Sequence, residues 1–141
     1  NRIAIGAPGA DRIPFDGRCA ADIRGAAYVF ARHRTLWVQE QKVDRLSGND
    51  RECVFAFGVD VGIGRDWLVV SSPSFFASQV ASPIAYQRSA SGFVPRWTLE
   101  GRDVGAAVIE MTGSTVFTGF PFDRFFSTGE VALYDLSAAA P

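Results

Sequence analysis

Hydrophobic and polar residues alternate in short runs along this chain, which is typical of β-strands. No window carries apolar residues at positions i, i+3, i+4 and i+7 over three turns, and the runs of β-branched and aromatic residues stop at Gly, Pro, Ser or Asp. Ten strands are predicted: Arg2–Ala7, Gly25–Ala31, Leu36–Val43, Val54–Val61, Trp67–Ser71, Pro83–Arg88, Phe93–Leu99, Val104–Glu110, Ser114–Gly119 and Gly129–Leu136. Short connections favour antiparallel neighbours, so the pattern predicts an all-β protein.

Three of these strands close at a proline, which indicates an internal repeat. Pro8, Pro73 and Pro121 follow runs of small and apolar residues, at spacings of 65 (73 − 8) and 48 (121 − 73) residues. Other pairs recur at similar intervals: Gly58 and Gly105 lie 47 residues apart, Tyr28 and Tyr86 58, Trp37 and Trp97 60, and Ala132 stands 46 residues after Tyr86 in the place of Tyr28. The unit is therefore about 47 residues long, and expanded loops at 10–24 and 44–52 lengthen its first copy.

A four-stranded unit of this length is typical of a β-propeller blade. The units run from about 1–53, 54–102 and 103–141, all within one domain. The first lacks its innermost strand, the second is complete and the third lacks its outermost strand. The sequence predicts about two and a half four-stranded antiparallel blades. They are either part of a larger propeller or a protomer that completes the ring by assembly, because two and a half blades cannot close one.

Short motifs recur in a fixed order along the units. They are Phe57-Gly58, Gly6-Ala7-Pro8, the strand Gly25-Ala26-Ala27-Tyr28-Val29-Phe30, and the strands carrying Trp37 and Trp97. In this order they resemble the FG-GAP repeat, which builds the propeller of integrin alpha subunits and of many bacterial secreted proteins. Three elements depart from it: Ser71-Ser72-Pro73, Gly119-Phe120-Pro121 and Val104-Gly105. The resemblance implies a non-catalytic binding or assembly module for protein–protein interaction or adhesion, at an extracytoplasmic location (secreted, periplasmic or cell-surface).

Charge and composition narrow the range of partners. The net charge is −1, so no basic excess favours binding to nucleic acid. Hydrophobic residues make up 48% of the chain, as in an ordinary globular protein. No apolar run approaches the roughly 20 residues of a membrane helix, so membrane insertion is not expected. The expected partner is another protein, or further blades of the same or another chain, including a homo-oligomer.

Catalytic, metal and cofactor signals are weak. His33 is the only histidine and lies in a predicted turn between two arginines, where a general base is not expected. The loop Gly62–Asp66 offers one carboxylate beside an arginine, too few oxygens for calcium. Asp11, Asp16 and Asp22 are the alternative metal site, with solvated loop acids as the simpler interpretation. The sequence therefore predicts no enzyme, no metal and no cofactor.

Two cysteines fall in the two expanded loops. In a propeller blade these loops emerge on the same face, so Cys19 and Cys53 are predicted either to form a disulfide or to remain buried thiols. A bridge would stabilise the fold by about 3–4 kcal/mol if unstrained and would imply an oxidising compartment.

Aromatic residues in predicted loops mark the candidate binding face. The proposed site residues are Phe15, Phe75, Phe76, Phe122, Phe125, Phe126 and Arg124. The alternative is that these phenylalanines anchor the loops between blades. Tyr28, Trp37, Tyr86 and Trp97 are expected in the blade core. Two other functions stay open: a carbohydrate-binding propeller with pockets lined by Trp37, Trp97 or Tyr86, and a non-catalytic propeller domain of a larger secreted enzyme.

Overall fold

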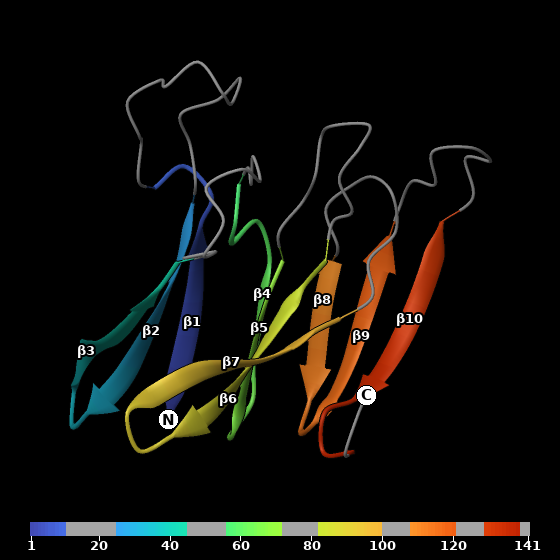
Figure 1. Ribbon diagram of the computed structural model, residues 1–141. Helices are drawn as coiled ribbons and strands as arrows, with labels where there is room; N and C mark the ends of the chain where they lie inside the picture. Colours follow the sequence, from blue (N-terminus) through green and yellow to red (C-terminus); the bar gives the residue numbers. More distant parts are fainter. Residues whose placement is uncertain (11–24, 45–55, 72–81, 100–107, 121–128, 139–141) are drawn as a thin grey trace.

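The chain folds into three small antiparallel sheets (Figure 1). The computed structural model describes residues 1–10, 25–44, 56–71, 82–99, 108–120 and 129–138, and these contain strands and turns but no helix. The strands are β1 (Arg2–Ala7), β2 (Ala26–His33), β3 (Leu36–Val43), β4 (Val61–Ile63), β5 (Trp67–Val70), β6 (Ile84–Ser89), β7 (Gly92–Thr98), β8 (Val108–Thr112), β9 (Thr115–Phe120) and β10 (Glu130–Asp135). The predicted all-β fold with antiparallel neighbours is confirmed.

Each sheet keeps its strands in chain order. Sheet 1 is β1-β2-β3, sheet 2 is β4-β5-β6-β7, and sheet 3 is β8-β9-β10. Such meanders follow from the short turns between consecutive strands. The expected division into three, four and three strands is therefore found among the described residues.

The first strands of sheets 2 and 3 end two residues further along the chain than predicted. The prediction of a strand over Val54–Val61 is wrong for residues 56–60, and the strand that does form ends at Ile63. Ala56 and Gly58 have φ angles of 55° and 85°, which interrupt extended backbone, and β4 begins only at Val61. The turn after it accordingly falls at residues 64–66, the second part of the predicted loop Gly62–Asp66.

In sheet 3 the strand predicted over Val104–Glu110 extends to Thr112 as β8. Gly113 takes the turn with a φ of 64°, a conformation that glycine adopts without steric cost, so the hairpin tip falls at residues 113–114. The other eight predicted strands agree with the structure to within two residues at each end.

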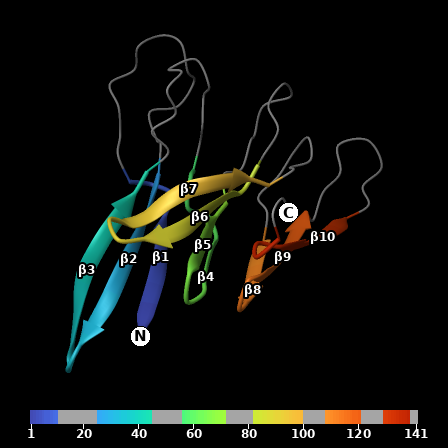
Figure 2. The same cartoon turned by 60° about the horizontal axis from the view of Figure 1, so that its bottom comes forward.

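Sheet 2 lies between the other two sheets and is covered on both faces (Figures 1 and 2). Strand β5 shows this directly, because all four of its residues are buried. Successive side chains of a strand point to opposite faces. Leu68 and Val70 pack into the core with sheet 1, and Trp67 and Val69 pack into the core with sheet 3.

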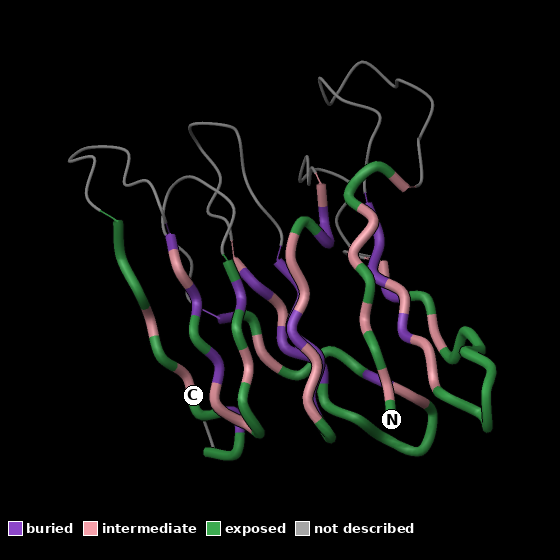
Figure 3. Tube along the Cα trace, turned by 180° about the vertical axis from the view of Figure 1, so that it is seen from behind, coloured by how far each residue is buried: buried purple, intermediate pink, exposed green. Residues whose placement is uncertain are grey.

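Two apolar cores therefore hold the three sheets together. The core between sheets 1 and 2 contains Ala27, Val29, Val43, Phe57, Leu68, Val70, Tyr86 and Phe93. The core between sheets 2 and 3 contains Trp67, Val69, Ala85, Leu99, Ile109, Val116 and Leu136. The alternation of buried and exposed positions along the strands can be followed in Figure 3.

The Phe57-Gly58 dipeptide joins sheet 2 to sheet 1 by close backbone approach. Phe57 is buried in the core between these sheets and forms an isolated parallel bridge with Gly25. A Cβ on Gly6 would lie 1.9 Å from the Gly58 carbonyl oxygen, and a Cβ on Gly58 would lie 2.4 Å from the Ala26 carbonyl oxygen. Only residues without a side chain fit at Gly6 and Gly58.

The register of the strands corrects the repeat alignment. Strands β2 and β6 both shift register against their outer neighbour, between Val29 and Phe30 and between Ala85 and Tyr86. Phe30, and not Tyr28, therefore corresponds to Tyr86, 56 residues later. The alignments of Tyr28 with Tyr86 and of Trp37 with Trp97 were wrong, because similar aromatic residues lie two or four positions away from the true equivalents.

Candidate functional site

The predicted loop site cannot be compared with the structure. Phe15, Phe75, Phe76, Phe122, Arg124, Phe125 and Phe126 all lie outside the described residues, as do Cys19, Cys53 and the three aspartates of the alternative metal site. The aromatic binding face and the disulfide therefore stay predictions.

The aromatic residues expected in the core divide into two groups. Tyr86 is buried between sheets 1 and 2, and Trp97 is partly buried against the core between sheets 2 and 3. Tyr28 is half-buried. Trp37 is 43% exposed, so its placement in the core was wrong. Trp37 lies on β3, where it pairs with Arg32 of β2. It is on the face of sheet 1 that no described strand covers.

This uncovered face of sheet 1 is the first of two candidate interaction surfaces. Ile3 and Ile5 alternate with Ala4, which packs toward sheet 2, so both point to the opposite side. Their partners on β2 are Phe30 and Tyr28. Ile3, Ile5, Tyr28, Phe30 and Trp37 together form what we term the sheet 1 outer face.

The same positions are buried in the neighbouring sheet. Ile3 pairs with Phe30 as Leu68 pairs with Tyr86. Leu68 is completely buried against sheet 1, whereas Ile3 is 37% exposed.

Two further positions repeat this contrast. Ile5 corresponds to the buried Val70 and is 49% exposed. Trp37 corresponds to the buried Phe93, since both pair with an arginine of the adjacent strand. At these three positions sheet 1 therefore exposes an apolar side chain, whereas the equivalent side chain of sheet 2 is buried against a neighbouring sheet.

Sheet 3 exposes a second apolar face on the opposite side of the molecule. Phe117 and Leu133 pair across β9 and β10, and Val108 and Val131 both pair with Gly119. They alternate with residues of the core between sheets 2 and 3, so they point away from sheet 2. Val131 and Leu133 are 72% and 63% exposed. Val108, Phe117, Val131 and Leu133 form the sheet 3 outer face.

The sequence carries a signal for these two faces. Residues 3–7 and 131–134 have small or apolar side chains on both faces of their strands. A strand that is apolar on both faces is expected to be covered on both. The loop phenylalanines are the more conspicuous signal, because aromatic residues outside strands are unusual.

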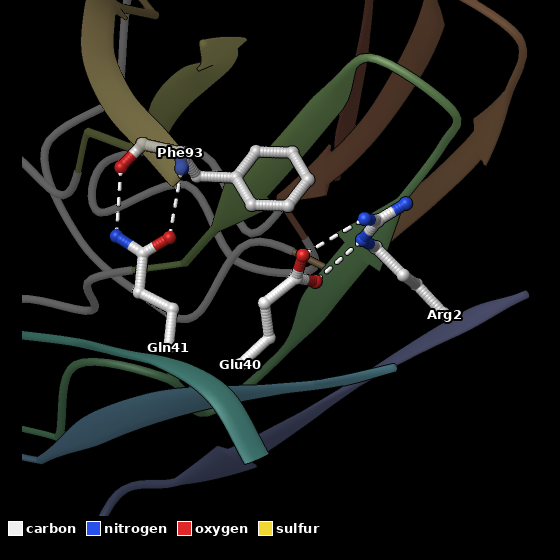
Figure 4. A network of polar contacts seen from close by, with 4 residues as sticks. All are labelled: Arg2, Glu40, Gln41 and Phe93. Carbon is white, nitrogen blue, oxygen red and sulfur yellow. Dashed lines mark hydrogen bonds and ion pairs between the residues drawn. The ribbon is translucent and has the colours of Figure 1, made fainter. Parts of the chain in front are cut away.

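Polar side chains add directed contacts between sheets 1 and 2 (Figure 4). The Gln41 Nε2 donates to the Phe93 carbonyl oxygen at 2.8 Å, and the Phe93 N–H donates to Gln41 Oε1 at 2.7 Å. Strand β3 thus holds the outermost strand of sheet 2 by a two-point contact. A sheet-to-sheet contact of this kind fixes position, which apolar packing alone leaves freer.

An ion pair lies beside this contact. Arg2 donates to Glu40 through Nε at 2.5 Å and through Nη2 at 2.8 Å (Figure 4). These hydrogen bonds lower the pKa of the Glu40 carboxyl below its ordinary value and raise the pKa of Arg2. The pair joins the first and third strands of sheet 1 across β2.

A carboxylate makes the polar connection between sheets 2 and 3. Asp60 Oδ1 accepts from the N–H of Val61, and Oδ2 accepts from the N–H of Ile109 at 2.7 Å. Asp60 therefore fixes the start of β4 and binds it to β8 of the next sheet.

Catalytic and metal-binding arrangements have little support in this part of the chain. His33 is exposed at the end of β2. Among the described residues, no group of three or more His, Cys, Asp or Glu side chains is placed to hold a metal ion. No helix able to span a membrane occurs in the described ranges.

Comparisons of the chain with protein-family models, with curated proteins and with solved structures found no match. The likeness to the FG-GAP repeat therefore depends on the sequence motifs alone.

Proposed function

We propose that this chain is a non-catalytic binding and assembly module that works by stacking an open sheet face against a protein partner. The proposal includes a fold of propeller-type blades related to the FG-GAP repeat and an extracytoplasmic location. Interaction with another protein, adhesion included, is the activity that such a module would supply.

The order of the strands supports the blade interpretation. The strands of sheet 2 follow chain order from one edge to the other, and each sheet packs on the next through its flat face. Propeller blades have both properties. The contact of Phe57-Gly58 with Gly6 also brings the Phe-Gly and Gly-Ala-Pro elements of adjacent units together, which gives both motifs a physical reason.

The sheet 1 outer face is the observation that carries the function. Large apolar patches on a soluble protein mark interaction sites. On this face Ile3, Ile5 and Trp37 occupy positions whose equivalents in sheet 2 are buried against another sheet. The face is therefore suited to a second β-sheet rather than to a small molecule.

Photo-crosslinking tests this proposal. The crosslinking amino acid p-benzoylphenylalanine replaces Ile5 in one variant and Val94 in a control, because Val94 is similarly exposed on β7 but lies on the middle sheet. Irradiation in an extract of the producing organism is expected to yield protein adducts at position 5 and few at position 94. Equal adduct yields at the two positions would refute the proposal.

Carbohydrate binding is the alternative, and the structure narrows its residues. Tyr86 is only 5% exposed and Trp97 is partly buried, so Trp37 is the aromatic residue with surface available for a sugar. A glycan-array signal that Trp37→Ala abolishes would favour this alternative.

A further inference from the structure

The two outer faces lie at opposite ends of one stack of sheets, and they are not equivalent faces of their sheets. Within the molecule, sheet 1 presents one face to sheet 2, and sheet 2 presents its opposite face to sheet 3. The sheet 1 outer face is thus equivalent to the face by which sheet 2 contacts sheet 1, and to the face by which sheet 3 contacts sheet 2. The sheet 3 outer face is equivalent to the face by which sheet 1 contacts sheet 2, and to the face by which sheet 2 contacts sheet 3.

The charges at the two ends are complementary. Sheet 1, over residues 1–10 and 25–44, contains the basic residues Arg2, Arg32, Arg34 and Lys42 and the acidic residues Glu40 and Asp44. Sheet 3, over residues 108–120 and 129–138, contains the acidic residues Glu110, Glu130 and Asp135 and neither lysine nor arginine. Over these described residues sheet 1 therefore carries more basic than acidic side chains, and sheet 3 carries acidic side chains alone.

Part of this charge stands on the outer faces themselves. Arg32 lies two residues after Phe30 and is exposed on the same side of β2. Glu110 pairs with Phe117, and Asp135 lies two residues after Leu133, so both carboxylates are on the sheet 3 outer face. Opposite charges on facing surfaces favour one orientation of association and disfavour the pairing of identical faces.

We infer that the partner of the outer faces is a second copy of this chain, bound head to tail, with the sheet 1 outer face of each copy on the sheet 3 outer face of the other. This inference rests on the proposed function and names its partner. Two copies contribute six sheets, which lies within the four to eight that close a propeller ring. The dimer would contain two identical interfaces, each built from unlike faces.

The native mass is the first measurement. Light scattering behind a sizing column is expected to give about twice the chain mass of 15.3 kDa. The single substitutions Ile5→Asp and Leu133→Arg each damage both interfaces of a homodimer, since every interface uses one face of each kind. Each is expected to weaken dimerisation by on the order of 30-fold or more, while Val94→Asp leaves the mass unchanged.

Mixing the variants separates head-to-tail from symmetric pairing. A dimer of one Ile5→Asp chain and one Leu133→Arg chain retains one undamaged interface, so the mixture is expected to recover dimers that neither variant forms alone. If Ile5→Asp abolishes the dimer and Leu133→Arg does not, identical faces pair and the head-to-tail inference is wrong. Circular dichroism of each variant confirms that its strands are intact.

A monomer at every concentration would overturn the second-copy inference alone. Adducts at position 5 with a different protein would then still support the binding function. Absence of adducts there, with the chain monomeric, would refute both.

Discussion

Truncation of Leu68 provides a direct test of the idea that the sheet-to-sheet cores hold this chain together. Leu68 on β5 is completely buried between sheets 1 and 2. Its equivalent in sheet 1, Ile3, pairs with β2 in the same way but is 37% exposed. The two positions therefore have similar chemistry in the same local structure and differ mainly in whether a second sheet covers them.

The expected losses differ by a factor of two or more. Leu→Ala removes three carbon groups, worth about 2.4 kcal/mol at about 0.8 kcal/mol each, and the cavity raises the total to about 3–4 kcal/mol. Ile3→Ala removes the same number of groups from a site about two-thirds buried, which gives at most about 1.5 kcal/mol and leaves no closed cavity. At roughly 2–4 °C per kcal/mol, Leu68→Ala lowers the Tm by about 6–16 °C and Ile3→Ala by at most about 6 °C.

Urea denaturation followed by tryptophan fluorescence and circular dichroism measures both free energies of unfolding. Leu68→Met serves as the conservative control and is expected to cost less than about 1.5 kcal/mol. The series is repeated over a hundredfold range of protein concentration, because a dimer that covers Ile3 would make the Ile3→Ala loss grow with concentration. Equal losses for the two alanine variants in dilute, monomeric protein would refute the assignment of buried and open faces.

Three other perturbations test the contacts between and within the sheets. Gln41→Leu removes the two-point contact with Phe93 and is expected to cost about 1–3 kcal/mol in urea denaturation, whereas Gln41→Glu places a carboxylate against the Phe93 carbonyl and should recover stability as the pH falls. Gly58→Ala forces a Cβ onto backbone at a φ of 85°, so the Tm should fall by more than it does for alanine at the open turn glycine Gly113. The depressed pKa of Glu40 means that its ion pair with Arg2 stabilises the fold above the ordinary glutamate pKa and loses that contribution as the pH falls through the folded-state value. In Arg2→Met this acid-dependent part of the stability curve should shrink, because the Arg2 hydrogen bond is the largest cause of the lowered pKa, and an unchanged pH profile would contradict the ion pair.

Only tertiary structure distinguishes Leu68 from Ile3. Both occur in short apolar strands, and alternation predicts a strand without specifying how many of its faces are covered. The aromatic alignment failed for a related reason. The register shifts in β2 and β6 move the pairing by one residue, and such bulges have no reliable mark in a single sequence.

The sequence by itself determined the strand content, the antiparallel order and the division into three, four and three strands. The strand content and the antiparallel order depend on local alternation and short turns, and the division depends on the spacing of the repeated motifs. Only the tertiary structure decided which faces are buried and which are open, because burial depends on neighbours distant in the chain. The stacking of three sheets covers both faces of the middle one and leaves one apolar face open at each end.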